Sequence, residues 1–212
     1  METETLIVGQ LDTNCYLVWD SETQEAVIID PADESNYISE KILANKLKPK
    51  AIIATHGHFD HLLAATELKL AFGIPFYMNQ GDLPILGRTE ETAEYFAHFR
   101  ALPPPKVDVF LREKDTIHFG GKALQVIESP GHTPGSICLY SKGFLFSGDT
   151  LFAHGIGRSD FSYASEEDLL ASLKKILKLP PETKILSGHG PQTSIETETF
   201  FLKELLSRKS RS

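Results

Sequence analysis

Short apolar runs separated by turn residues fill much of the first quarter of the chain and predict β-strands there. A first helix is predicted over 35–47, where Ile38 and Ile42 fall on one face. A second helix is predicted from near Leu62 to Gly73, because glycine commonly ends helices. The predicted strands cover 6–8, 16–19, 26–29 and 51–54.

The second half of the chain repeats this order of strands followed by helices. Ser165 is a good helix cap, the acidic residues 166–168 suit the positive end of a helix, and an apolar stripe runs on to Leu177. Two such halves indicate an α/β fold, and because no linker separates them we expect one domain over 1–212. The other elements predicted here are strands over 123–127, 136–140, 144–146 and 184–187, and a helix over 195–206.

The segment 80–106 is less regular than either half. It contains helical stretches with Leu86 and Phe96 and ends in three consecutive prolines, 103–105. Three interpretations stay open: a lid, a contact in a homodimer, or ordinary surface helices packed on the core.

Composition and charge exclude several classes of protein. The net charge of −8 argues against a general nucleic-acid binder, and the basic tail 208–211 is expected to be a solvated end. No apolar run approaches the roughly 18 residues that cross a bilayer. The acidic, polar start 1–5 does not resemble a signal peptide, so we expect a cytoplasmic protein without a membrane partner.

The chain has two cysteines, Cys15 and Cys138, and each lies in an apolar run. We expect buried thiols that pack as small hydrophobic side chains. Two isolated cysteines cannot form a cysteine-rich structural zinc site.

Residues that bind metals occur in four groups, each directly after an apolar run and usually beside glycine. Loops that follow strands of one sheet can meet at one edge, so these groups are expected to share a cleft. Imidazole and carboxylate ligands suit zinc, iron or manganese, and so many of them suit two ions. The groups are His56, His58, Asp60 and His61; His132; Asp149; and His189.

Not every histidine belongs to this pattern. A histidine alone in a loop is more often a surface or packing residue than a ligand, which is how we interpret His98 and His118. His154 follows Asp149 closely, so it is either a surface residue or a substrate contact.

The four groups together resemble the metallo-β-lactamase superfamily, and more narrowly its short glyoxalase II-like (hydroxyacylglutathione hydrolase-like) members. The resemblance runs nearly end to end, with the four groups in order. It includes Asn14-Cys15-Tyr16 near the start and Gly157-Arg158-Ser159-Asp160 after Gly148-Asp149-Thr150.

The resemblance implies a four-layer αβ/βα sandwich with two divalent metal ions, Zn²⁺ first and iron or manganese as alternatives. It implies that His56, His58 and His132 hold one ion, that Asp60, His61 and His189 hold the other, and that Asp149 bridges them. Asp60, His61 and Asp149 are the implied catalytic residues. A hydroxide shared by the ions would attack a small-molecule thioester or ester.

Glyoxalase II proper has further C-terminal helices that hold glutathione, whereas this chain ends soon after His189. The leaving thiol therefore stays open. Arg158, His154 and Tyr163 are the candidates for substrate contact, although Arg158 could instead form an ion pair with Asp160.

Two other enzymatic interpretations stay open. A persulfide dioxygenase of the same fold would use one iron on His56, His132 and Asp149. A less specific metallo-hydrolase would show weak β-lactamase, lactonase or ribonuclease activity.

Overall fold

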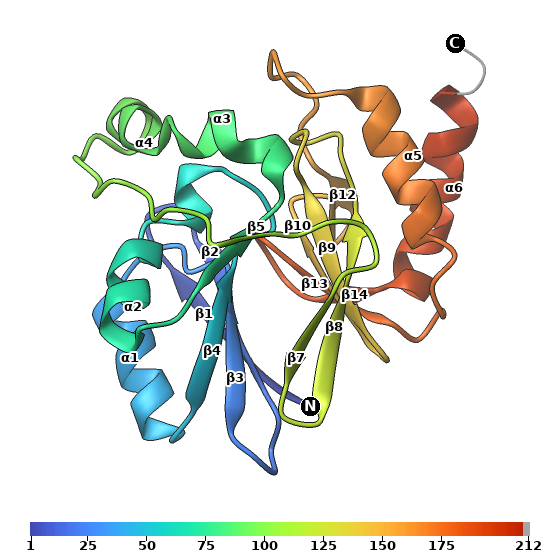
Figure 1. The fold of residues 1–212 in the computed structure, drawn as a ribbon. Coiled ribbons are helices and arrows are strands. Elements are labelled where there is room, and N and C mark those ends of the chain that lie inside the picture. Colours follow the sequence, from blue (N-terminus) through green and yellow to red (C-terminus); the bar gives the residue numbers. More distant parts are fainter. Residues whose placement is uncertain (210–212) are drawn as a thin grey trace.

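The computed structural model describes residues 1–209 and contains two six-stranded sheets (Figure 1). Residues 210–211 of the basic tail lie outside the described part. The first sheet follows chain order, with antiparallel pairing at one end and parallel pairing from β3 to β6. Its strands are β1 Glu2–Val8, β2 Thr13–Trp19, β3 Glu25–Ile29, β4 Lys48–Ile53, β5 Phe76–Met78 and β6 Val109–Phe110.

The second sheet has the order β14-β13-β10-β9-β8-β7, and only β10 and β13 pair in parallel. A small hairpin, β11 Leu151–Phe152 with β12 Gly155–Ile156, follows β10. The strands of the second sheet are β7 Thr116–Phe119, β8 Lys122–Glu128, β9 Ile137–Ser141, β10 Phe144–Gly148, β13 Lys184–Ser187 and β14 Thr193–Ser194.

Helices cover the outer face of each sheet, which gives four layers (Figure 1). α1 Ser35–Ala44 and α2 Ala65–Phe72 lie on the first sheet, and α5 Glu166–Ile176 and α6 Ile195–Lys209 lie on the second. The predicted αβ/βα sandwich is therefore confirmed.

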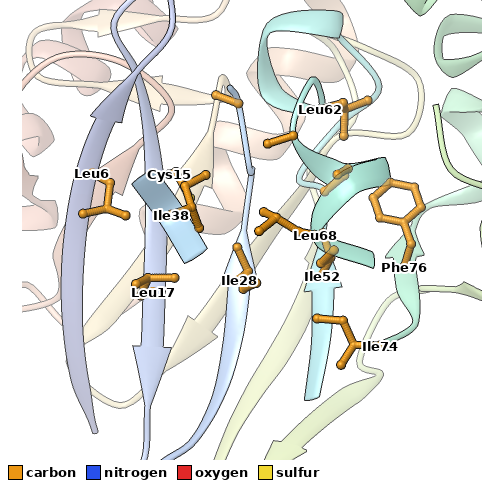
Figure 2. Packing of buried hydrophobic residues seen from close by; sticks show 14 of the residues in the cluster. Leu6, Cys15, Leu17, Ile28, Ile38, Ile52, Leu62, Leu68, Ile74 and Phe76 are labelled. Atoms are coloured by element: carbon orange, nitrogen blue, oxygen red, sulfur yellow. The ribbon is translucent and has the colours of Figure 1, made fainter. Parts of the chain in front are cut away.

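The core consists of three apolar layers that match this arrangement. Leu17 of β2 belongs to the layer that includes Ile38 of α1, while Tyr16 faces the other way and contacts the Phe146 ring of the second sheet at 5.2 Å between centroids. Figure 2 shows the first layer, where Ile28, Ile38 and Leu68 pack together. Because β2 is buried on both faces, its sequence from Cys15 to Trp19 is continuously apolar rather than alternating.

Helix ends differ from the prediction where the backbone turns. α1 stops at Ala44 rather than at Leu47, because Lys46 adopts a left-handed conformation (φ 54°) that directs the chain into β4. The chain after His58 first forms a short 3₁₀ turn, η1 Phe59–His61, and α2 begins only at Ala65. The predicted cap is confirmed, since the Ser165 hydroxyl accepts from the Asp168 N–H at 3.2 Å.

The segment 80–106 forms a 3₁₀ turn, η2 Gln80–Asp82, followed by the short helices α3 Leu83–Leu86 and α4 Thr89–Ala97. α4 packs on Phe59 through Ala93 and Ala97, and Phe96 stacks on the Phe59 ring at 6.3 Å between centroids. This segment therefore covers η1, the turn that carries two of the predicted ligands.

The two cysteines are buried and unpaired, as predicted. Burial raises the pKa of Cys138 to about 11 and also raises that of Cys15, so both thiols stay protonated at neutral pH. Within residues 1–209, no helix combines the length and the apolar character needed to cross a membrane.

Candidate metal centre

The loops that follow β4, β8, β10 and β13 meet at one end of the sandwich and bring the predicted ligands together. Their ligand atoms form three overlapping trios, and within each trio the atoms lie within 4.8 Å of one another. The trios are His56, His58 and His132; His56, His61 and Asp149; and Asp60, His61 and His189.

In the first trio, three imidazole nitrogens point at one another. His58 Nδ1 lies 3.1 Å from His56 Nε2 and 3.0 Å from His132 Nε2. Two neutral imidazole nitrogens can share at most one proton, so three nitrogens this close bring unshared lone pairs together. Such crowding of lone pairs is typical of ligands around a cation.

The trio of Asp60, His61 and His189, called the second trio from here on, contains a carboxylate, and Asp149 lies between it and the first trio. Asp60 Oδ2 is 3.4 Å from His189 Nε2 and 3.7 Å from His61 Nε2. Asp149 places Oδ1 3.5 Å from His61 Nε2 and Oδ2 3.6 Å from His132 Nε2. One carboxylate thus reaches both halves of the cluster.

Protein groups hold the outward nitrogen of each ring in the first trio. The Thr55 hydroxyl is 3.1 Å from His56 Nδ1, and the Tyr163 hydroxyl is 2.7 Å from His58 Nε2. His132 Nδ1 donates to the Arg158 carbonyl at 2.9 Å. Such contacts fix ring orientation and tautomer, and they leave the inward nitrogens free for a ligand.

The same arrangement recurs in the second trio. His61 Nδ1 lies 3.1 Å from Asp30 Oδ2, and His189 Nδ1 donates to the Leu11 carbonyl at 3.0 Å. Asp30 also accepts from the Thr55 backbone N–H and hydroxyl, each at 2.7 Å. One buried carboxylate therefore supports His61 directly and His56 through Thr55.

The loop that carries His189 is held by the start of β2. Asn14 Nδ2 donates to the carbonyls of Ser187 and Gly190, each at 2.9 Å, and the Tyr16 hydroxyl donates to the Ser187 carbonyl at 2.6 Å. Glycine is required at position 188, because a Cβ there would lie 2.2 Å from Asp149 Oδ1. The Asn14-Cys15-Tyr16 motif thus has a structural role at the site.

The two halves differ in charge. Burial and the adjacent His132 lower the pKa of His58 to about 3, and burial lowers that of His56 as well. Burial also opposes charge on His61, but Asp149, Asp60 and Asp30 outweigh it and raise the pKa of His61 to about 10. His56 and His58 are therefore neutral imidazoles at neutral pH, whereas the carboxylates around His61 hold a proton there that a metal ion would displace.

The cluster suits divalent metal ions. His61 Nε2 and Asp149 Oδ1 are buried and have no hydrogen-bond partner among the described residues, although buried polar atoms almost always have one. The two atoms lie 3.5 Å apart, so one metal ion could contact both and satisfy them.

The proposed substrate contacts lie in different places. Tyr163 is beside His58, and its ring stacks on Phe161 at 5.5 Å. Arg158 forms a two-point ion pair with Asp160 at 2.8 and 2.9 Å, while its side chain stays 67% exposed. His154 is 76% exposed and faces Glu198 of α6 at 3.6 Å.

Two functional carboxylates escaped the sequence prediction. Asp30 directly follows β3, so it carried the same signal as the ligands, a polar residue after an apolar strand. Asp82 lies in the irregular segment 80–106, where no local pattern marks it.

The family model of the metallo-beta-lactamase superfamily matches residues 8–189, and the chain belongs to this superfamily. It is 37% identical to an uncharacterized protein of Aquifex aeolicus, with 95% of each chain covered. It is 35% identical to the hydroxyacylglutathione hydrolase GloC of Haemophilus influenzae, over 93% of this chain and 95% of that protein. The family makes the chain a metallo-hydrolase.

Solved structures agree with this placement. The B3 metallo-beta-lactamase BLEG-1 has a TM-score of 0.88 at 33% identity, with 95% of this chain and 99% of that chain covered. TTHA1623 in a di-iron-bound form has a TM-score of 0.85 at 37% identity, over 92% and 96%. ETHE1 from Myxococcus xanthus has a TM-score of 0.78 at 28% identity, over 94% and 82%.

Proposed function

We propose that this protein hydrolyses thioesters of the hydroxyacylglutathione type with two divalent metal ions, Zn²⁺ being the proposed metal. The observation that carries the proposal is the orientation of the five histidines. Each has its outward nitrogen held by a protein group and its inward nitrogen directed at the cluster. The similarity to GloC supports the substrate class.

The two trios divide the ligands between the ions. His56, His58 and His132 would hold one ion, Asp60, His61 and His189 would hold the other, and Asp149 would contact both. When bound by these residues, the ions would supply an acidified water as nucleophile and would polarise the substrate carbonyl.

The chain's own residues would orient the reactants. Asp60 is partly exposed and has an oxygen to accept a hydrogen bond from the attacking water. Attack forms a bond from the water oxygen to the acyl carbon and breaks the carbon–sulfur bond, giving a carboxylic acid and a thiol. Because a thiolate leaves easily, no separate general acid is required.

We propose that Tyr163 and Arg158 contact the substrate. Both lie on the loop after β12, and the Arg158 guanidinium sits 4.5 Å over the Phe161 ring, next to His58 and His132. Its ion pair with Asp160 is solvent-exposed and therefore weak, so an anionic substrate group could compete for it.

A dioxygenase with one iron on His56, His132 and Asp149 is the second candidate, because His132 and Asp149 approach to 3.6 Å and the ETHE1 structure is similar. The complete set of seven ligands favours the hydrolase, since three of them suffice for the iron site.

The test combines metal analysis with two assays on the purified protein. We expect two ions per chain and oxygen-independent cleavage of a hydroxyacylglutathione thioester. His58→Ala should lose the first ion and the cleavage. His118→Ala, a change at an exposed histidine on β7, should keep both. One iron with oxygen uptake on glutathione persulfide would instead support the dioxygenase. Full thioesterase rate without bound metal would refute both candidates.

A further inference from the structure

Asp82 is a fully buried carboxylate, 0% exposed, at the end of η2. Its Oδ2 accepts from the Gly57 N–H and from the Thr133 hydroxyl, each at 2.7 Å. Its Oδ1 accepts from the Gly135 N–H at 2.6 Å. The three donors come from the two loops that carry the first trio.

Each donor lies close to a ligand in the chain. Gly57 stands between His56 and His58, and Thr133 follows His132 directly. Charge-assisted hydrogen bonds of this length are strong, and each is protected from water. Asp82 thus connects the loop of His56 and His58 to the loop of His132.

Both loops approach Asp82 closely, and at Gly135 only glycine fits. A Cβ at Gly135 would lie 2.6 Å from the Asp82 nitrogen and 2.7 Å from its Cγ. A Cβ at Gly57 would meet Asp82 Cβ and its carbonyl oxygen, each at 3.0 Å. The backbone of both loops is therefore shaped around this side chain.

We propose that Asp82 is a positioning residue that fixes the two loops at the spacing where His56, His58 and His132 converge on one metal ion. This inference rests on the proposed metal centre. It assigns a role to η2, the first element of the segment 80–106.

The test is Asp82→Asn, which keeps the shape but turns an amide N–H toward one of the three donors. We expect the affinity of the first ion to fall about 10- to 100-fold, as it does when outer-shell partners are lost. The affinity of the second ion should change much less. Zn²⁺ titration against a competing chelator measures a dissociation constant for each ion.

Asp20→Asn is the matched control. Asp20 is also a buried aspartate, and it accepts from the Gly121 N–H at 2.7 Å and the Thr23 hydroxyl at 3.4 Å. It follows β2 at the end away from Asn14 and the cluster. This variant should lose stability in thermal unfolding while both ions bind as in the wild type.

A second readout needs no metal. In the metal-free protein, hydrogen exchange of the Gly57 and Gly135 amides should speed up in Asp82→Asn and stay unchanged in Asp20→Asn. Thr133→Val, which removes one donor and leaves the carboxylate, should give a smaller effect.

Unchanged amide exchange in Asp82→Asn would overturn the proposal. An equal loss of affinity for both ions in Asp82→Asn and in Asp20→Asn would also overturn it. If the wild type bound no metal, the proposed function and the proposed metal-positioning role would both fail. Faster exchange of the Gly57 and Gly135 amides in Asp82→Asn would then show only that Asp82 holds the two loops together by hydrogen bonds.

Discussion

The two halves of the ligand cluster are built from similar residues but are supported differently. The first trio is mostly buried: the His132 side chain is 5% exposed, only His58 is half-buried, and Asp82 connects its two loops. The second is more open, with the His189 side chain 29% exposed and its Nδ1 held by the carbonyl of the exposed residue Leu11. The comparison indicates that buried contacts preorganise the first trio, whereas the second trio is more open to solvent on its His189 side.

Removing the residue shared by both halves should have the largest effect. Asp149→Asn takes away the negative charge between His61 and His132, so we expect loss of one ion and a fall in kcat of more than about 100-fold, beyond the loss typical of outer-shell changes. Metal content and steady-state kinetics measure this. Wild-type metal content with near-normal kcat would contradict the bridging position of Asp149.

Asp30→Asn should have a smaller effect that reaches both halves. Asp30 contacts His61 directly and His56 through Thr55, so the change should weaken each ion, by about 10- to 100-fold for the more affected one. Asp82→Asn should weaken only the first ion. Chelator competition on the two variants distinguishes these patterns, and identical patterns would show that the halves are not supported independently.

The sequence predicted the ligands better than their supports, for a physical reason. His56, His58, Asp60 and His61 form a dense local cluster after a strand, and burying so many polar groups signals a partner such as a metal. Asp82 forms its hydrogen bonds with residues 25, 51 and 53 positions away, so no local pattern could reveal it.

Helix boundaries likewise depend on contacts between residues distant in the sequence, which local patterns do not predict. The apolar stripe of α1 extends to Leu47, but the turn at Lys46 depends on the pairing of β4 with β3, a contact that periodicity does not encode. The α/β class was predictable because strands and amphipathic helices follow from the order of apolar residues, whereas the four-layer sandwich was implied by the resemblance to a family. The resemblance to a family, rather than any local pattern, supplied the division of ligands into two trios.

The smallest effect is expected at Tyr163, which belongs to the first half through its contact with His58 Nε2. Tyr163→Phe keeps the ring stacked on Phe161 and removes one hydrogen bond, worth about 0.5–1.5 kcal/mol. The affinity of the first ion should therefore fall about two- to tenfold, while Tyr95→Phe, at an exposed position on α4, should leave it unchanged.

The kinetics of Tyr163→Phe separate its two roles. A rise in KM for the thioester with unchanged metal affinity would make Tyr163 a substrate contact alone. Weaker metal binding with unchanged KM would make it a support of His58 alone. Loss of the first ion to the extent expected for Asp30→Asn would contradict the comparison, because it would mean that the half-buried Tyr163 supports the site as strongly as a buried carboxylate.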